Sequence, residues 1–176
     1  QIYFLEGNSE TDFPVSLVLS PDARYAITGS NDGIIKVLDI ESGSIIYTLH
    51  AHKGAVHLLA VTPDSSRFVS TSDGDSLKIW DMKNGELIRS QTQSLWLTAL
   101  AVTTNGDFVI GGSEGGILYI WQLEDGVQIF SPSDEHRHKD YITSLALTSD
   151  GSRVISGSVD STIKIWDVAS GRVIDT

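Results

Sequence analysis

Serine, histidine and aspartate side chains recur in this sequence in the combination that serine hydrolases use for catalysis. His138, Ser156 and Asp160 lie close together in the chain, and His52 and Ser70 repeat the first two residue types upstream. A hydrolase triad needs an exposed serine nucleophile with an oxyanion hole beside it. Because the combination recurs along the chain and does not occur just once, it favours a structural role over catalysis.

Two His-x-His pairs present side chains of the type that bind zinc or copper. They are His50 with His52 and His136 with His138. No carboxylate recurs beside the first member of each pair, and the sequence also lacks a phosphate-binding glycine loop, an HExxH motif and a nucleophile elbow. We therefore expect no metal, no cofactor and no enzymatic activity.

The segments that carry these residues repeat at a period of about 43 residues. Strand-like runs occur at residues 34–39, 76–81, 117–122 and 162–167. Each is preceded by two further apolar runs and followed by a fourth, with clusters of Gly, Ser, Asp and Asn between them. No helical periodicity is present, so the sequence predicts an all-β fold of four units, each with four antiparallel strands.

The repeated residues resemble the WD-repeat family of β-propellers over nearly the whole chain. Trp80-Asp81 and Trp166-Asp167 stand at the family's Trp-Asp position, and His52 and His138 match its histidine before the first strand. The resemblance implies propeller blades of four antiparallel strands. The predicted domain is 1–176, with repeats at about 8–50, 51–92, 93–135 and 136–176.

In this family a Trp indole, a Ser or Thr hydroxyl, a His ring and an Asp carboxylate form a chain of hydrogen bonds within one blade. The fourth repeat matches at every position. The residues that the resemblance assigns to this network are, by repeat, Thr28 and Asp32; His52, Ser70 and Trp80; Trp121; and His138, Ser156, Asp160 and Trp166.

The other three repeats depart from the family pattern. The second has Gly74 where the aspartate belongs, which leaves Asp73 or Asp75 to reach the histidine. The first has Leu38 in place of the tryptophan, and the third has Gly111 in place of the hydroxyl. We therefore expect the fourth blade to have the most complete network.

A partner surface is predicted where the first strands begin and the second strands end, because WD-repeat proteins commonly bind peptides there. Large aromatic residues occupy one equivalent position in three repeats, as interface anchors do, although they could instead cover the channel mouth or a neighbouring strand. The predicted partner-binding residues are Phe13, Asn31, His57, Asp73, Trp96, Thr98, Glu114, Tyr141 and Thr143.

The charge balance indicates which partner to expect. Twelve Lys and Arg against 23 Asp and Glu give a net charge of −11, which repels phosphate backbones and anionic lipid. We expect a protein or a peptide, preferably a basic one, and neither nucleic acid nor a membrane.

Composition sets the broad class of the protein. The 176 residues are 40% hydrophobic and 20% charged, as in ordinary globular domains. No apolar run approaches the roughly 20 residues of a membrane-spanning helix. Cysteine is absent, which fits a reducing compartment, and we expect a cytoplasmic location.

The ends of the chain indicate an incomplete array. Residues 1–7 resemble the end of a fourth strand, although no blade precedes them. Repeat units bury their apolar faces on neighbours, so we expect either a fragment of a longer array or a half-propeller that a second copy completes. Two chains of four blades would form an eight-bladed homodimer, within the usual range of about 4 to 8 blades.

Two functions follow from this interpretation. The first is a non-enzymatic scaffold for protein–protein interaction. The alternative is a self-assembling or regulatory WD-repeat segment of a larger, nucleotide-sensing type of protein, which rests on analogy.

Overall fold

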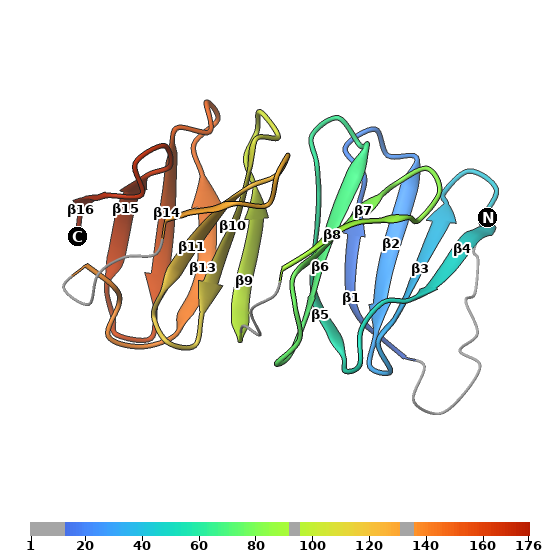
Figure 1. Ribbon diagram of the computed structural model, residues 1–176, viewed down its shortest axis with the longest axis horizontal. Helices are drawn as coiled ribbons and strands as arrows, with labels where there is room; N and C mark the ends of the chain where they lie inside the picture. The colour runs from blue at the N-terminus through green and yellow to red at the C-terminus, as the bar shows by residue number, and fades with distance from the viewer. Residues whose placement is uncertain (1–12, 92–95, 131–135) are drawn as a thin grey trace. The chain divides into compact units, whose positions relative to one another are not determined.

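The computed structural model describes residues 13–91, 96–130 and 136–176, which form β-strands and no helix (Figure 1). The strands make four separate sheets of four antiparallel strands each. This confirms the predicted all-β fold. No helix in the described ranges has the length and apolar character needed to cross a membrane.

The sheets follow the sequence order, and each contains four consecutive strands. Sheet 1 contains β1 (Pro14–Leu19), β2 (Tyr25–Ser30), β3 (Ile34–Asp39) and β4 (Ile45–His50). Sheet 2 contains β5 (Val56–Val61), β6 (Arg67–Ser72), β7 (Lys78–Asp81) and β8 (Leu87–Ser90). Sheet 3 contains β9 (Leu97–Val102), β10 (Phe108–Ser113), β11 (Leu118–Gln122) and β12 (Gln128–Phe130). Sheet 4 contains β13 (Ile142–Leu147), β14 (Arg153–Ser158), β15 (Ile163–Asp167) and β16 (Val173–Asp175).

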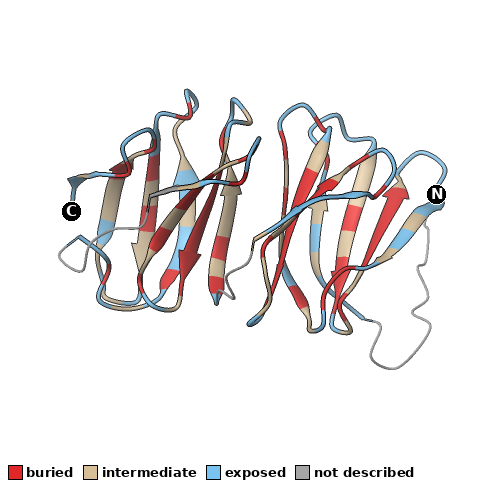
Figure 2. Ribbon diagram, in the orientation of Figure 1, coloured by how far each residue is buried: buried red, intermediate tan, exposed pale blue. Residues whose placement is uncertain are grey.

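The chain divides into two compact units, residues 1–95 with sheets 1 and 2 and residues 96–176 with sheets 3 and 4. Within the first unit, β1 and β2 pack against β5, and the strands carry buried positions, drawn red in Figure 2. Ile27, Ile35 and Phe68 are fully buried there. Within the second unit, β9 and β10 pack against β13, and Ile142 and Val154 are fully buried. Each unit therefore has a core formed between two sheets.

One irregularity recurs at the start of every first strand. Residues Pro14, Val56, Leu97 and Ile142 each pair with the serine that ends the second strand, and the register shifts by one residue directly afterwards. These four residues therefore occupy the same position in the four sheets.

Glycine is required in the turn between the second and third strands of sheets 1 and 3. Gly33 has φ +84°, and a Cβ there would lie 2.2 Å from the carbonyl oxygen of His52. Gly116 has φ +72°, and its Cβ would lie 2.3 Å from the carbonyl oxygen of His138. Their own carbonyls accept hydrogen bonds from the backbone N–H groups of those histidines at 3.0 Å. Each turn thus positions the histidine that begins the next sheet.

The predicted strand end at residues 1–7 lies outside the described residues. The repeat boundaries and the expected eight-bladed dimer stay predictions.

Candidate functional site

Sheet 4 contains the complete hydrogen-bonded network. The Trp166 indole N–H donates to Ser156 Oγ at 2.8 Å, and that oxygen lies 2.7 Å from His138 Nε2. His138 Nδ1 lies 3.0 Å from Asp160 Oδ2. Ser156 and His138 are fully buried, so this serine is not an exposed nucleophile. The four side chains fix the packing of the sheet and form no hydrolase site.

The carboxylate of Asp160 also organises the turn that leads into β15. It accepts hydrogen bonds from the backbone N–H groups of Lys139 and Thr162 and from the Thr162 hydroxyl. Burial acts to raise the pKa of Asp160, but these hydrogen bonds outweigh it and hold the pKa well below the usual range. The network therefore ends on a carboxylate that stays ionised.

Sheet 2 builds the same network with Asp75. Trp80 Nε1 donates to Ser70 Oγ at 2.8 Å, and Ser70 Oγ lies 2.7 Å from His52 Nε2. His52 Nδ1 lies 3.0 Å from Asp75 Oδ2, and Lys78 Nζ lies 3.6 Å from the same oxygen. Burial lowers the pKa of His52, which favours the neutral imidazole in the fold.

Asp73 is the other aspartate that the sequence offered as the partner of His52. Its side chain contacts His57 instead. Its Oδ2 lies 3.0 Å from His57 Nε2, and both side chains are nearly half exposed. The two residues were both predicted to contact a partner. The structure brings the two side chains into contact at the end of sheet 2.

Sheets 1 and 3 lack the full network. Asp32 accepts hydrogen bonds from the Ser30 hydroxyl at 2.6 Å and from the Ile34 N–H at 3.3 Å, so it caps its own turn. Thr28 is half-buried in the neighbouring strand. The matching position in sheet 3 is Gly111, which carries no hydroxyl.

The buried Trp121 ring packs directly on this glycine. A Cβ on Gly111 would lie 2.9 Å from the ring and 3.0 Å from Leu97. Trp121 also stacks on Tyr119, with ring centroids 5.4 Å apart. Aromatic packing thus takes the place of the polar network in sheet 3.

Three predicted aromatic anchors occupy one structural position. The backbone carbonyl of each accepts a hydrogen bond, at 3.0–3.1 Å, from the N–H of the residue that follows the second strand. The pairs, carbonyl first, are Phe13 with Asn31, Trp96 with Glu114, and Tyr141 with Val159. The aromatic residues are 50%, 54% and 48% exposed, so about half of each side chain faces solvent. We call Trp96 and Tyr141, which belong to the same unit, the aromatic row; Phe13 is their equivalent in the other unit.

Thr98 and Thr143, which were also predicted to contact a partner, form hydrogen bonds within the protein through their hydroxyls. The Thr98 hydroxyl donates to the backbone carbonyls of Gly112 and Ile142. The Thr143 hydroxyl donates to the Gly157 carbonyl at 3.3 Å. Both hydroxyls are therefore engaged with the backbone of their own unit.

One buried hydroxyl belongs to the residue that precedes Asp73 in the chain. Ser72 Oγ is the buried side-chain oxygen or nitrogen without a hydrogen-bond partner in the described part of the chain. The equivalent Ser30 bonds to Asp32, whereas sheet 2 has Gly74 at that place. Gly74 therefore has two effects. The network aspartate of sheet 2 lies one residue later than expected, and among the described residues Ser72 has no carboxylate partner.

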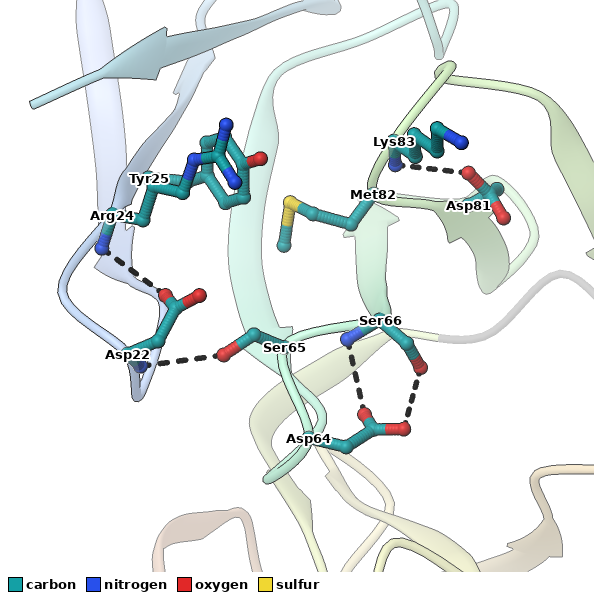
Figure 3. Close-up of a pocket in the computed structure, with 9 residues that line it drawn as sticks. All are labelled: Asp22, Arg24, Tyr25, Asp64, Ser65, Ser66, Asp81, Met82 and Lys83. Atoms are coloured by element: carbon teal, nitrogen blue, oxygen red, sulfur yellow. Dashed lines mark hydrogen bonds between the residues drawn. The ribbon is translucent and has the colours of Figure 1, made fainter.

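A cavity of about 480 Å³ opens at the opposite strand ends of the first unit (Figure 3). The Arg24 guanidinium lies 5.0 Å from the centre of the Tyr25 ring on one side, and Met82 projects from the other (Figure 3). Hydrogen bonds from the Thr62 hydroxyl and from Ser66 lower the pKa of Asp64 to about 2. The sequence did not indicate this cavity, because turns far apart in the chain form it.

No metal site is evident where the sequence offered histidine pairs. In the described ranges no three His, Asp or Glu side chains gather as metal ligands would. His52 and His138 belong to the networks of sheets 2 and 4, and the carboxylates beside them are the network aspartates.

Comparisons with known proteins agree with this geometry. The family model described as "WD domain, G-beta repeat" matches residues 1–39, 43–81 and 129–167, which is more than half of the chain. Human "WD repeat-containing protein 3" is 30% identical over 74 residues, covering 42% of this chain and 8% of that protein. Human "Pre-mRNA-processing factor 17" is 35% identical over 71 residues, covering 39% of this chain and 12% of that protein.

Solved structures share the fold at low sequence identity. A chain in the "Crystal Structure of Mitotic Checkpoint Complex" matches 95% of this chain with a TM-score of 0.83 and 18% identity, over 51% of its own length. The "computationally designed Ika4 protein" matches 93% of this chain with a TM-score of 0.79 and 24% identity, over 96% of its own length. The chain spans only about a tenth of the two curated relatives described above.

Proposed function

Because this chain belongs to the WD-repeat family, whose repeats generally mediate protein–protein interaction, we propose that it is a non-enzymatic scaffold that binds a protein or peptide segment at the aromatic row. Its framework histidines, serines and tryptophans are used in the hydrogen-bonded networks of sheets 2 and 4. The residues that remain for recognition lie at the strand ends.

The exposure of Trp96 and Tyr141 carries this proposal. Both belong to the second unit and directly precede the first strands of sheets 3 and 4, and each is about half exposed. The other three tryptophans, Trp80, Trp121 and Trp166, are at most 6% exposed. Rigid aromatic side chains of this kind provide contact area at low entropy cost, and they are the residues that interface hot spots favour.

Acidic residues that directly follow the second strands favour a basic partner. Glu114 follows the second strand of sheet 3 and bonds through its backbone to Trp96, and Asp73 holds the matching place in sheet 2. With a net charge of −11, the chain attracts Lys and Arg side chains and repels nucleic acid phosphates. A relative named as a pre-mRNA-processing factor suggests RNA-processing assemblies as one setting, in which this chain would contact protein.

Tryptophan fluorescence provides a direct test, since Trp96 is the exposed one of the four tryptophans. We expect an array of short peptides that combine Lys or Arg with apolar residues to contain sequences that change the emission on binding. Trp96→Phe should abolish the optical change. Trp96→Ala and Tyr141→Ala should each weaken binding by about tenfold or more, measured by calorimetry.

A matched control keeps the outcome interpretable. Val127 is 53% exposed on the loop before β12, so Val127→Ala removes exposed apolar surface away from the aromatic row. It should leave peptide affinity unchanged. Peptide binding that survives both Trp96→Ala and Tyr141→Ala would refute this location of the site.

The second candidate is a self-assembling or regulatory segment of a larger protein. It is supported by the small share of each curated relative that the chain covers. A nucleotide-binding region encoded beside this segment in the parent gene would favour the regulatory form of this function over an independent scaffold.

A further inference from the structure

The cavity of about 480 Å³ lies within the first unit, where turns of sheets 1 and 2 come together (Figure 3). The turn between β1 and β2 contributes Arg24, which directly precedes Tyr25 at the start of β2. The turn between β5 and β6 contributes Ser65, and Met82 follows the end of β7. Ligand pockets typically have volumes of about 300–1,000 Å³, so this cavity is large enough to take a side chain of a partner.

The carboxylates that line the cavity serve their own turns. Asp64 accepts a hydrogen bond from the Thr62 hydroxyl at 2.6 Å, and Asp150 in sheet 4 accepts the same bond from Thr148 at 2.5 Å. The other two carboxylates of the lining accept hydrogen bonds from backbone N–H groups of the turns that they begin. These carboxylates therefore belong to the turns, and they do not by themselves indicate a ligand.

Arg24, Tyr25 and Met82 distinguish this cavity from the matching place in the second unit. The strand registers identify the equivalents, because Tyr25 pairs with the last residue of β3 as Phe108 pairs with the last residue of β11. Met82 and its equivalent each donate a backbone N–H to the serine before the second strand. The equivalents of Arg24, Tyr25 and Met82 are, in that order, Asp107, Phe108 and Val168. The second unit forms the same turns with these residues, so the turns do not require the guanidinium, the phenol or the thioether.

The three distinguishing groups face one another across the cavity. The Arg24 guanidinium lies 5.0 Å from the centre of the Tyr25 ring, and the Arg24 side chain is 66% exposed. Figure 3 shows the Met82 side chain pointing from the other side toward these two residues, and Met82 is buried. The Tyr47 hydroxyl donates to the Met82 carbonyl at 2.7 Å, which fixes the backbone at this residue. The cavity thus has a fixed apolar wall opposite a guanidinium that is open to solvent.

A hydrogen bond between two turns holds sheets 1 and 2 together beside the cavity. The backbone N–H of Asp22 donates to Ser65 Oγ at 3.3 Å. Ser65 has φ +59°, a left-handed conformation that is unfavourable for serine, whereas Gly151 holds the equivalent place in sheet 4. Glycine would adopt this conformation more easily, but it has no hydroxyl to join the turns. The walls of the cavity are therefore preorganised, which reduces the entropy cost of binding.

A guanidinium, a phenol ring and a thioether share one favourable neighbour, which is an aromatic ring. A guanidinium is attracted to the face of an aromatic ring, most strongly to that of tryptophan. A methionine sulfur makes favourable contacts about 5 Å from a ring, and two rings pack with their centres about 4.5–7 Å apart. The lining carboxylates disfavour an anion, and Arg24 and Lys83 disfavour a cation. An uncharged aromatic group therefore suits the lining best.

We propose that this cavity binds the side chain of a tryptophan in a partner protein. The indole lies between the Arg24 guanidinium and Met82, and it contacts the Tyr25 ring. Tryptophan is also among the residues that interface hot spots favour. This site lies in the first unit and the aromatic row lies in the second, so the proposal does not depend on the proposed function.

Met82 provides a direct test, because it is the one methionine of the sequence. Labelling the methionine methyl group with ¹³C gives an NMR signal that Met82→Leu identifies by its loss. We expect N-acetyl-tryptophanamide, an uncharged indole compound, to cause a saturable ring-current shift of this signal. N-acetyl-leucinamide, the apolar control without a ring, should bind about tenfold more weakly or not at all. The absence of a saturable shift, or equal binding of the two compounds, would overturn the proposal.

Charge reversals test the location of the site. Arg24→Asp copies the residue that the second unit has at this place, so the variant should fold, and it should bind the indole compound about tenfold more weakly. Arg89→Asp makes the same change in charge at an exposed position on β8 outside the cavity lining, and it should bind as the wild type does. Undiminished binding in Arg24→Asp, or an equal loss in both variants, would refute this location.

A last variant separates the two proposed sites. Trp96→Ala removes a residue of the aromatic row and should leave the shift of the Met82 signal unchanged. A shift that disappears in Trp96→Ala would assign the bound indole to the aromatic row and would overturn the proposal for the cavity.

Discussion

Asp75 Oδ2 lies 3.0 Å from Nδ1 of His52, and this contact decides how sheet 2 completes its network. The sequence offered two aspartates, one on each side of Gly74. The structure uses the later one for the buried network and the earlier one, Asp73, for the exposed pair with His57. Neighbouring residues of the same type therefore have different roles.

This difference predicts unequal effects of two similar substitutions. Asp75→Ala removes a hydrogen-bonded carboxylate from a buried histidine and should lower the free energy of unfolding by about 2 kcal/mol. Asp73→Ala removes an exposed contact with His57 and should change the free energy of unfolding by less than about 0.5 kcal/mol. Urea denaturation of both variants provides the measurement, and equal effects would contradict the assignment.

The pKa of His52 predicts a loss of stability in mild acid. Burial lowers this pKa in the folded state from its ordinary value of 6.5, so below that pH the unfolded chain takes up a proton that the folded chain does not. The free energy of unfolding should therefore fall between about pH 7 and pH 5. His52→Gln, although less stable throughout, should show a shallower fall over the same range. An unchanged slope in that variant would exclude His52 as the cause.

A further loss of stability should follow at lower pH. The pKa of Asp64 and of Asp150 is lowered from 3.8 to about 2, because hydroxyl and backbone donors bond to the ionised carboxylates. Their contribution is fully present above pH 3.8 and is lost as pH falls toward 2. Thermal unfolding below pH 4 should detect this second decline, and Asp150→Asn should reduce it.

The unpaired Ser72 hydroxyl predicts a substitution that does not destabilise the fold. A buried hydroxyl without a partner costs about 1–3 kcal/mol, so Ser72→Ala should leave stability unchanged or raise it by up to about 1 kcal/mol. The equivalent Ser30→Ala breaks bonds to Asp32 and to the Ile34 carbonyl and should lower stability by about 1 kcal/mol. Denaturation curves of the pair would refute this if Ser72→Ala were the more harmful change.

Placing a serine at Gly111, where the family has a hydroxyl residue, should destabilise the protein. In Gly111→Ser the new Cβ would lie 2.9 Å from the Trp121 ring and 3.0 Å from Leu97, so the core is overpacked. We expect a loss of about 1–3 kcal/mol in the free energy of unfolding. Gly115→Ser, at an exposed position with open space, serves as the control and should change stability by less than about 0.5 kcal/mol. A stabilised Gly111→Ser variant would show that the ring moves to accept the hydroxyl.

The repeats were readable from the sequence because each strand has its own apolar pattern and each turn its own Gly, Asp or Ser. The strand that contains residues 34–39 was predicted with its observed bounds. The third strand of sheet 2 is shorter than predicted, since β7 starts at Lys78 and not at residue 76. Asp75 explains the difference, because its carboxylate bonds to the N–H and hydroxyl of Ser76 and keeps that residue in the turn.

The sequence by itself determined the all-β fold, the family and the Trp, Ser and His residues of the networks in sheets 2 and 4, because these depend on local pattern and on spacing that repeats. Only the tertiary structure decided which aspartate reaches His52, that the Thr98 hydroxyl bonds to the carbonyl of the next sheet, and that Val56 and Ile142 pack on Gly29 and Gly112. Those outcomes depend on how one sheet packs on another. Strand periodicity specifies which face a residue lies on, but it does not specify what lies opposite.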